Sequence, residues 1–449
     1  MCSKGVALMT KDQMKEKCIN TIDNNKNKII DLGRRLYSNP ELGYKEVNST
    51  EIAYDFLKNL GLNTEKNIAV TGCRARTNEG RKGPKIAVIG ELDAILCKEH
   101  KDANKEGAVH ACGHNTQVAV MLGTALSLIN SGVIKELDGK VDFMAVPAEE
   151  FIEFDYRKEL KEAGMINFFG GKQELIYKGA FDDIDIAMMV HSLDIGKNKV
   201  LLNLKSDGFI GKKITFIGKA SHAGSSPENG INALNSAMLA LNNINALRET
   251  FRDEDWVRVH AIITKGGDIV NVVPSEVKME AYVRARTADS ILKSNRKVNN
   301  AVFSAAMAVG AAVEIDDTFG YLPLTNNEQL IDVLRGNLGY LCKENEVIEE
   351  GKFTGSFDFG DVSHIIPSIQ PMIGGIEGNL HTAEYKIVDE ETAYILPAKA
   401  MTLTIIDLLY GYAEKANKII ADFKPSLTKE EYIRLLKDHS KKYTANYNV

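Results

Sequence analysis

Up to about residue 206, the chain alternates short apolar runs with segments whose apolar positions recur every three or four residues. Short continuous apolar runs are typical of buried strands, and spacings of three and four predict helices. The pattern predicts three strands and three helices, the strands at 85–90, 141–146 and 184–190 and the helices at 24–37, 49–60 and 115–130. Strands that alternate with helices indicate an α/β fold, with a mainly parallel sheet and helices on both faces.

A different rhythm begins near Asp207. From there the pattern predicts strands and helices in the order βαββαβ, at 212–218, 230–247, 259–264, 277–286, 288–309 and 312–316. This order is that of a ferredoxin-like unit. Helical spacing then resumes at 327–341 and 398–412. We therefore expect an α/β domain in two parts, 1–206 and 322–449, with a smaller α+β domain inserted at 207–321.

Composition excludes several classes of protein. Of the 449 residues, 44% are hydrophobic and 26% charged, as in soluble globular proteins. Lys and Arg number 55 against 61 Asp and Glu, a net charge of −6, and no dense basic cluster suggests a nucleic-acid partner. No run approaches the ~18 apolar residues of a membrane span, and the N-terminal residues become charged too soon for a secretory signal. These features predict a cytoplasmic protein.

The six cysteines lie at scattered positions, namely Cys2, Cys18, Cys73, Cys97, Cys112 and Cys342. Their spacing matches no disulfide framework, so they are interpreted as reduced thiols, in agreement with a cytoplasmic location. Cys112 differs from the others because it stands in His-Ala-Cys-Gly-His-Asn, two residues before His114, at the start of a predicted helix.

Other chemically capable residues also lie at or near the ends of predicted strands. Asp93 follows strand 85–90, Glu149 and Glu150 follow strand 141–146, and His191 follows strand 184–190. His381 stands in a later loop. In open α/β sheets, the carboxyl ends of the strands form the binding sites.

Each of these features alone has an ordinary structural explanation, such as a buried cysteine, a solvated glutamate pair or a hydrogen-bonded histidine. Together they form a set of sulfur, nitrogen and oxygen ligands, made of Cys112, His114, Glu150, His191 and His381. Such a set suits a hydrolase with two metal ions, whereas a structural zinc site needs four closed ligands in local pairs. Glu149, beside a ligand carboxylate, is then placed to act as a general base.

Six motifs follow one another along the chain in this order: Gly-Glu-Leu-Asp-Ala, His-Ala-Cys-Gly-His-Asn, Pro-Ala-Glu-Glu, Lys-Ala-Ser-His-Ala-Gly, Asn-Val-Val-Pro and Leu-His-Thr-Ala-Glu-Tyr. In this order the chain resembles the aminoacylase and carboxypeptidase G type metallopeptidase family, and most closely its amidohydrolase branch. The resemblance runs from about residue 31 to 400, including the inserted domain. It implies hydrolysis of a small amide, such as an N-acyl amino acid, an aminobenzoyl-glutamate-like compound or a dipeptide.

The resemblance also implies a role for each matching residue. Two divalent ions (zinc, manganese, cobalt or nickel) are held by the five ligands named above, and Glu149 acts as general base. Asp93 lies near the ions without binding them. His222, Asn271 and Arg284, on the inserted lid domain, bind the substrate, and His222 also stabilises the oxyanion. The family further implies a homodimer formed through the lid.

The chain departs from this family's pattern at several positions. Many members have Asp and His where this chain has Asn115 and Gln117, so we expect a different environment around the metals. Residues 151–153 replace a common Gly-Gly, and the aromatic and charged segment 154–175 that follows is expected to form a flap over the substrate pocket. The Lys-rich tail, 417–449, is expected to be a surface helix.

Two alternatives remain at this stage. Cys112 could be the nucleophile of a thiol hydrolase with His114 as its base, although two residues this close in sequence are poorly placed for that pairing. The chain could also be a binding protein that keeps the hydrolase fold without catalysis.

Overall fold

The computed structural model describes residues 9–77 and 79–447. Residues 1–8 lie outside this range. They include Cys2 and the start of the segment considered as a secretory signal. The chain forms two compact units. The first comprises the described residues of Met1–Lys205, Thr325–Lys352 and Asp361–Ser426, and the second those of Ser206–Leu324, Phe353–Gly360 and Leu427–Val449.

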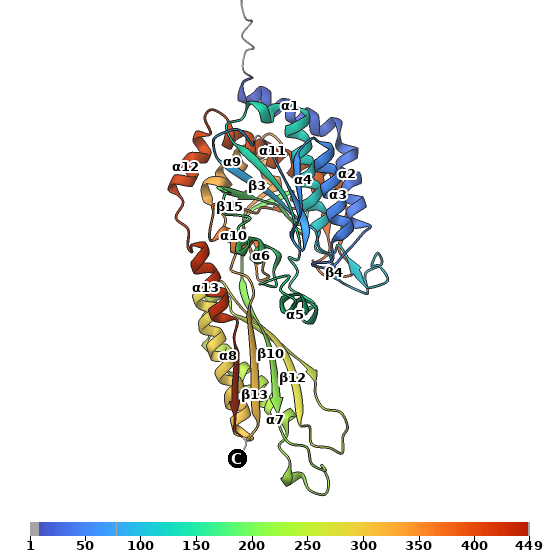
Figure 1. Ribbon diagram of the computed structural model, residues 1–449, viewed down its shortest axis with the longest axis vertical. Coiled ribbons are helices and arrows are strands. Elements are labelled where there is room, and N and C mark those ends of the chain that lie inside the picture. The colour runs from blue at the N-terminus through green and yellow to red at the C-terminus, as the bar shows by residue number, and fades with distance from the viewer. Residues whose placement is uncertain (1–8, 78, 448–449) are drawn as a thin grey trace, which may run out of the picture. The chain divides into compact units, whose positions relative to one another are not determined.

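The first unit is built on a six-stranded sheet (Figure 1). Its strands follow the spatial order β1 (Asn63–Ala69), β2 (Thr71–Arg76), β6 (Lys140–Val146), β3 (Lys85–Glu91), β7 (Ile186–Met188) and β15 (Ser368–Ile369). The four strands from β6 to β15 pair in parallel, while β1 and β2 form an antiparallel hairpin at one edge. This confirms the predicted α/β fold with a mainly parallel sheet, since β3, β6 and β7 are the three apolar runs.

Helices pack around this sheet. They are α1 (Lys11–Asn24), α2 (Lys26–Tyr37), α3 (Val47–Asn59), α4 (His114–Asn130), α9 (Glu328–Leu338) and α11 (Leu396–Leu409). The central one, α4, contacts β3, α2 and α11 and is buried along nearly its whole length. Because α4 is held on several sides, its N-terminus is fixed near the carboxyl end of β3, where the candidate ligands lie.

One helical stretch of the described chain, Glu391–Leu409, is long and apolar enough to cross a membrane. It joins a π-helical turn, Glu391–Ile395, to α11, and 94% of its apolar window is buried inside the structure. That burial is the behaviour of a core helix, in keeping with the contacts of α11 with α1, α4 and α9.

The second unit has the predicted ferredoxin-like arrangement. Its elements follow the chain order β10 (Gly208–Ile217), α7 (Ala233–Ala246), β11 (Arg258–Lys265), β12 (Glu276–Ala285), α8 (Ala288–Ala308) and β13 (Ala312–Phe319). The strands form an antiparallel sheet in the order β11, β12, β10, β13, and α7 and α8 pack against β10 and β12. In β12 every second residue is buried, because only one face of the sheet meets these helices.

The C-terminal tail differs from the expected surface helix of the first domain. It forms α12 (Glu414–Asp422), α13 (Lys429–His439) and a strand, β19 (Lys442–Asn446). β19 pairs antiparallel with β13 and adds a fifth strand to the sheet of the second unit. Residues from Leu427 onward therefore belong to that unit. The physical reason is the open edge of β13, whose unpaired backbone groups β19 satisfies.

Candidate metal centre

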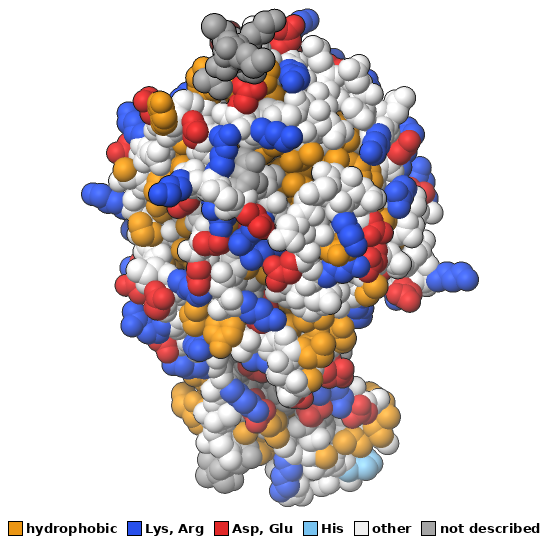
Figure 2. Space-filling model, turned by 45° about the horizontal axis from the view of Figure 1, so that its top comes forward, with side chains coloured by type: hydrophobic (Ala, Val, Ile, Leu, Met, Phe, Trp, Pro, Cys, Tyr) orange, Lys and Arg blue, Asp and Glu red, His pale blue; other side chains and the backbone are white. Residues whose placement is uncertain are grey.

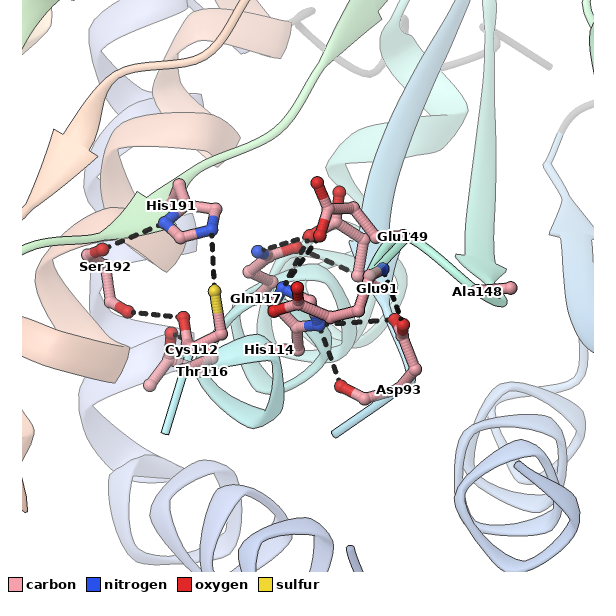
Figure 3. A network of polar contacts seen from close by, with 12 residues as sticks. Glu91, Asp93, Cys112, His114, Thr116, Gln117, Ala148, Glu149, His191 and Ser192 are labelled. Carbon is pink, nitrogen blue, oxygen red and sulfur yellow. Dashed lines mark hydrogen bonds and ion pairs between the residues drawn. The ribbon is translucent and has the colours of Figure 1, made fainter. Parts of the chain in front are cut away.

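The predicted ligands of the first unit gather around the carboxyl ends of β3 and β6. Figure 3 shows three of them, Cys112, His114 and His191, beside Asp93 and Glu149. Asp93 follows β3, and Glu149 and Glu150 follow β6. His191 begins the two-residue strand β8 (His191–Ser192), and the backbone N–H of His381 donates to the carbonyl of Ala111, 2.8 Å away. Residues far apart in the sequence are thus brought to one place by the topology of the sheet.

The turn between Cys112 and His114 depends on a glycine. Gly113 has φ of 77°, and a Cβ at this position would lie 1.9 Å from Oγ of Ser192 and 2.3 Å from the hydroxyl of Tyr385. Only glycine adopts this backbone conformation while leaving room for both side chains. The turn begins α4 and lets the buried side chains of Cys112 and His114 enter the same small volume.

The ligand atoms form two groups that share one sulfur. One group is Cys112, His114 and His191, the other is Cys112, Glu150 and His381, and in each the ligand atoms lie within 4.8 Å of one another. Sγ of Cys112 lies 3.6 Å from Nε2 of His191 and 3.2 Å from Nε2 of His381. Oε1 of Glu150 lies 3.0 Å from Nε2 of His381. The geometry therefore offers places for two metal ions, with Cys112 common to both.

The hydrogen bonds of His114 and His191 use Nδ1 and leave Nε2 of each ring available to bind a metal. Nδ1 of His114 lies 2.8 Å from the carbonyl of Asp93, and Nδ1 of His191 lies 2.9 Å from that of Ser192. A carbonyl only accepts, so Nδ1 is the donor in each of these hydrogen bonds, and Nε2 is the nitrogen that each ring turns toward the ligand groups. Nε2 of His114 and Oε1 of Glu150 are buried and make no hydrogen bond within the described residues, as expected of atoms that bind a metal.

Electrostatics favour the thiolate form of Cys112. Burial and the neighbouring carboxylate of Glu150 act to raise the pKa of this thiol, but the imidazoles of His114, His381 and His191 outweigh them and lower it to about 6. The thiolate, not the thiol, is the form that binds metals. Cys112 is therefore a competent ligand at neutral pH.

A strained residue, Ala148, directly precedes Glu149 and Glu150. Ala148 has φ of 56°, and its N–H donates to Oε1 of Glu46 at 2.8 Å. A positive φ at a residue other than glycine costs energy and is common at functional sites. Oε2 of Glu149 lies 3.8 Å from Nε2 of His114, whereas the backbone N–H of Glu150 donates to Oδ2 of Asp93 at 2.8 Å. Glu149 thus faces the first ligand group and Glu150 belongs to the second.

Asp93 lies beside the ligands, as the resemblance implies. Its carbonyl oxygen and its carboxylate both contact Nδ1 of His114, at 2.8 and 3.3 Å, while Oδ2 accepts the hydrogen bond from Glu150. Asp93 is absent from the clusters of residues positioned to hold an ion. The residue therefore orients two ligands at once, one in each group.

Two residues of the centre, Glu91 and Lys172, were missed from the sequence, and Gln117 was noted only as a departure from the family's pattern. Oε2 of Glu91 lies 3.2 Å from Nε2 of His114 and accepts a hydrogen bond from Nε2 of Gln117 at 2.7 Å, and Oε1 pairs with the Lys172 ammonium. Burial would raise the pKa of Glu91, but Lys172 and nearby histidines lower it to about 2. Glu91 stands two residues before Asp93, and Gln117 one helical turn after His114, so both carried a signal. Lys172, 81 residues from Glu91, carried none.

Two positions of helix α4 depart from the family's pattern, Asn115 and Gln117. Gln117 contacts Glu91 at the metal centre, whereas the side chain of Asn115 makes its hydrogen bonds to other parts of the first unit. The side-chain amide of Asn115 donates to the carbonyl of Gly33 at 3.2 Å and to the hydroxyl of Tyr394 at 3.1 Å. It thereby links the start of α4 to α2 and the π-helical turn. Of the two positions, it is Gln117 that contacts a residue beside the ligands, through its hydrogen bond to Glu91.

The remaining predicted residues, His222, Asn271 and Arg284, lie in the second unit. Nδ1 of His222 accepts hydrogen bonds from the N–H groups of Gly224 and Ser225, at 3.1 and 3.0 Å, and its side chain is exposed. The backbone of Ala223 donates to the carbonyl of Asn271, so these two loops lie side by side. Arg284 donates to the hydroxyl of Ser356 at 2.8 Å. Their roles toward the substrate stay predictions.

Comparison with known proteins agrees with this geometry. The sequence profile of Peptidase family M20/M25/M40 matches residues 87–405. The human Xaa-Arg dipeptidase is 29% identical over 432 residues, which is 90% of each chain. The N-acyl-L-amino acid amidohydrolase of Geobacillus stearothermophilus is 26% identical over 334 residues, 72% of this chain and 83% of the relative.

Solved structures show the same fold. A dinuclear metal-binding peptidase of the M20 family from Bacillus subtilis superposes with a TM-score of 0.65 at 21% identity, covering 86% of this chain and 99% of that one. The matched profile includes residues of all three segments of the first unit and the Ser206–Leu324 segment of the second, which confirms the resemblance noted from the motifs. The chain therefore belongs to Peptidase family M20/M25/M40, whose members are hydrolases of amide and peptide bonds.

Proposed function

We propose that the protein hydrolyses the amide bond of a small substrate, an N-acyl amino acid, an aminobenzoyl-glutamate-like compound or a dipeptide, with two divalent metal ions and Glu149 as general base. The observation that carries this proposal is the pair of ligand groups sharing Cys112, with Glu149 facing one of them. A closed structural site would not need a further carboxylate at its side.

The ligand chemistry limits the choice of metal. Thiolate and imidazole ligands favour zinc, cobalt or nickel, and the carboxylate of Glu150 also admits manganese. When bound, such ions lower the pKa of water and polarise a carbonyl. The residues of the chain supply the rest: Asp93 and Ser192 fix the histidine tautomers, and the buried position of Glu149 keeps its carboxylate close to the ligands.

Glu149 takes a proton from the attacking water and gives it to the departing nitrogen. A general base has to lie within reach of the proton that it removes, and its carboxylate lies beside the nitrogen of His114 that faces the ligand group. His222 is assigned to stabilise the oxyanion, and Asn271 and Arg284 to hold the substrate. His222 suits this role because its Nδ1 is occupied as an acceptor, which leaves Nε2–H free to donate.

The names of relatives narrow the first substrates to test. Two of them, from human and mouse, are called Xaa-Arg dipeptidase, and a third is called an N-acyl-L-amino acid amidohydrolase. The panel therefore contains Xaa-Arg dipeptides, N-acyl amino acids and aminobenzoyl-glutamate. Turnover of none of these by metal-loaded protein would favour a non-catalytic binding role instead.

We further propose a cytoplasmic homodimer formed through the second unit. The support is a set of exposed apolar side chains on and near β11 and on α7, namely Ile262 at 51%, Ile269 at 61%, Val270 at 100% and Met238 at 53% exposure. Such exposure is typical of protein interfaces. Sedimentation of the purified protein tests the dimer.

The charges at the surface do not suggest a nucleic-acid partner. On the face seen in Figure 2, positive and negative side chains are interspersed, so that face offers no basic stripe for nucleic acid.

Removing the metal ions is expected to abolish activity. After treatment with 1,10-phenanthroline and dialysis, turnover of the best substrate in the panel should fall to background and return when zinc or manganese is added. The same chelator presaturated with zinc serves as the control. Full activity in the chelator-treated protein, with metal shown to be absent by mass spectrometry, would support the thiol-hydrolase alternative.

A further inference from the structure

A buried ion pair adjoins the metal centre. The ammonium of Lys172 and the carboxylate of Glu91 are in contact, and their side chains are 0% and 1% exposed. Both carboxylate oxygens are engaged, because Oε1 meets Lys172 and Oε2 accepts from Gln117 at 2.7 Å. Burying a lysine costs several kcal/mol unless its partner is well placed, so the position of the pair is itself informative.

Glu91 belongs to a third cluster that is able to hold a metal. Oxygen or nitrogen atoms of Glu91, His114 and Glu149 lie within 4.8 Å of one another. Glu91 therefore competes for the same nitrogen, Nε2 of His114, that serves the group with Cys112 and His191. An ion drawn to this third cluster would also engage Glu149, which the proposed reaction needs as a base and not as a metal ligand.

Lys172 is supplied by the segment 154–175, which the sequence predicted as a flap. The segment forms α5 (Phe154–Glu162) and α6 (Gly171–Tyr177), and Lys172 is the second residue of α6. The N–H of Gly171 donates to the carbonyl of Ala148 at 3.0 Å, and a Cβ on Gly171 would lie 1.6 Å from the carbonyl oxygen of Pro147. The start of α6 is thus pressed directly against the loop that carries Glu149 and Glu150.

A second buried cation of the segment reaches the same loop. Arg157, on α5, is 1% exposed and donates to the carbonyl of Glu150 and, at 2.6 Å, to that of Phe169. The segment therefore makes polar contact with the metal centre at two points, and only Lys172 contacts a carboxylate that is able to bind metal.

We propose that Lys172 is a positioning residue that holds Glu91 out of the ligand set, so that the metal ions settle in the two groups sharing Cys112 and Glu149 stays outside the ligand set. This inference rests on the proposed two-metal function. Lys172 acts by contact with Glu91 and touches neither substrate nor metal. Its expected signature is therefore a change in metal binding, and a loss of turnover follows from that change.

The test is the metal preference of Lys172→Met. Without the ammonium of Lys172, Glu91 becomes an additional oxygen ligand near His114. Compared with sulfur and nitrogen ligands, oxygen ligands favour manganese over zinc. Competition titrations should show the manganese-to-zinc affinity ratio rising by about 10-fold, the scale typical of residues that orient metal ligands. The visible spectrum of the cobalt-substituted protein should change with it. Lys172→Arg should stay near wild type.

Two further variants separate this role from a structural one. Lys172→Met/Glu91→Gln removes the competing carboxylate together with its cation, so it should fold and recover the wild-type metal preference and cobalt spectrum. Lys178→Met, on the exposed side just after α6, is the matched control and should change neither. If Lys172→Met alone fails to fold, the double variant decides the question.

The outcomes distinguish this inference from the proposed function. A Lys172→Met protein with wild-type metal preference and cobalt spectrum overturns the inference, as does a double variant that keeps an altered preference. Neither result touches the proposed function so long as the wild-type protein binds two ions and hydrolyses its substrate. A wild-type protein that binds no metal overturns both.

Discussion

Glu149→Gln is expected to lower turnover by about 10³-fold, within the range contributed by a general base, while leaving the metal content unchanged. Glutamine keeps the size of the side chain but cannot accept a proton at neutral pH. Glu149 is not a member of either ligand group that contains Cys112, so its loss removes the proton acceptor and leaves the ligands in place. The measurements are kcat on the best substrate and metal content by mass spectrometry.

Glu153→Gln is the matched control for this variant. Glu153 lies four residues further along the same loop, and its carboxylate pairs with Lys45 at 2.7 Å instead of facing the ligands. Its turnover should stay within about twofold of wild type, since surface ion pairs contribute little. Full activity in Glu149→Gln would remove Glu149 from the mechanism, and loss of metal in that variant would make it a ligand.

Cys112→Ala is expected to lose both metal ions. Its sulfur is the one ligand atom common to the two groups, so its removal leaves each ion with two of three ligands. The affinity for both ions should fall by more than about 100-fold, beyond the loss typical of residues that merely orient a ligand. Turnover should disappear with the metals. Metal content after dialysis against a weak chelator measures this directly.

Variants of the unshared ligands provide the comparison. His191→Ala should weaken the ion beside His114, and His381→Ala the ion beside Glu150, so each should retain close to one ion per chain. Cys342→Ala controls for loss of a thiol, because Cys342 is a free cysteine outside both groups. A Cys112→Ala protein that binds two ions as tightly as wild type would exclude Cys112 from the centre.

The clustering of the predicted ligands could be expected in part, because Glu150 and His191 follow apolar strands and Cys112 and His114 stand at the start of a helix. Cys112 and His114 are joined by the glycine turn, and Glu150 stands in the loop that follows β6. The parallel order of β3, β6 and β7 then brings these ends together without further information. The sequence did not show which ligand is shared, because sharing depends on distances of 3 to 4 Å between side chains.

Residues that depend on distant contacts could not be predicted. Lys172 lies in a segment whose aromatic and charged composition indicated a flap over the substrate pocket, yet its side chain is fully buried against Glu91. β19 has a polar sequence, Lys-Tyr-Thr-Ala-Asn, with the composition of a solvated segment. It becomes a strand because the edge of β13 is available to it. In both cases the partner, not the local pattern, determines the structure.

The central claim is that two metal ions share the sulfur of Cys112. Anomalous diffraction at the zinc absorption edge, from crystals of the wild-type protein grown with zinc, tests it most directly. We expect two peaks, one among Cys112, His114 and His191 and the other among Cys112, Glu150 and His381. A single peak, or a peak among Glu91, His114 and Glu149 away from the sulfur, would contradict the account.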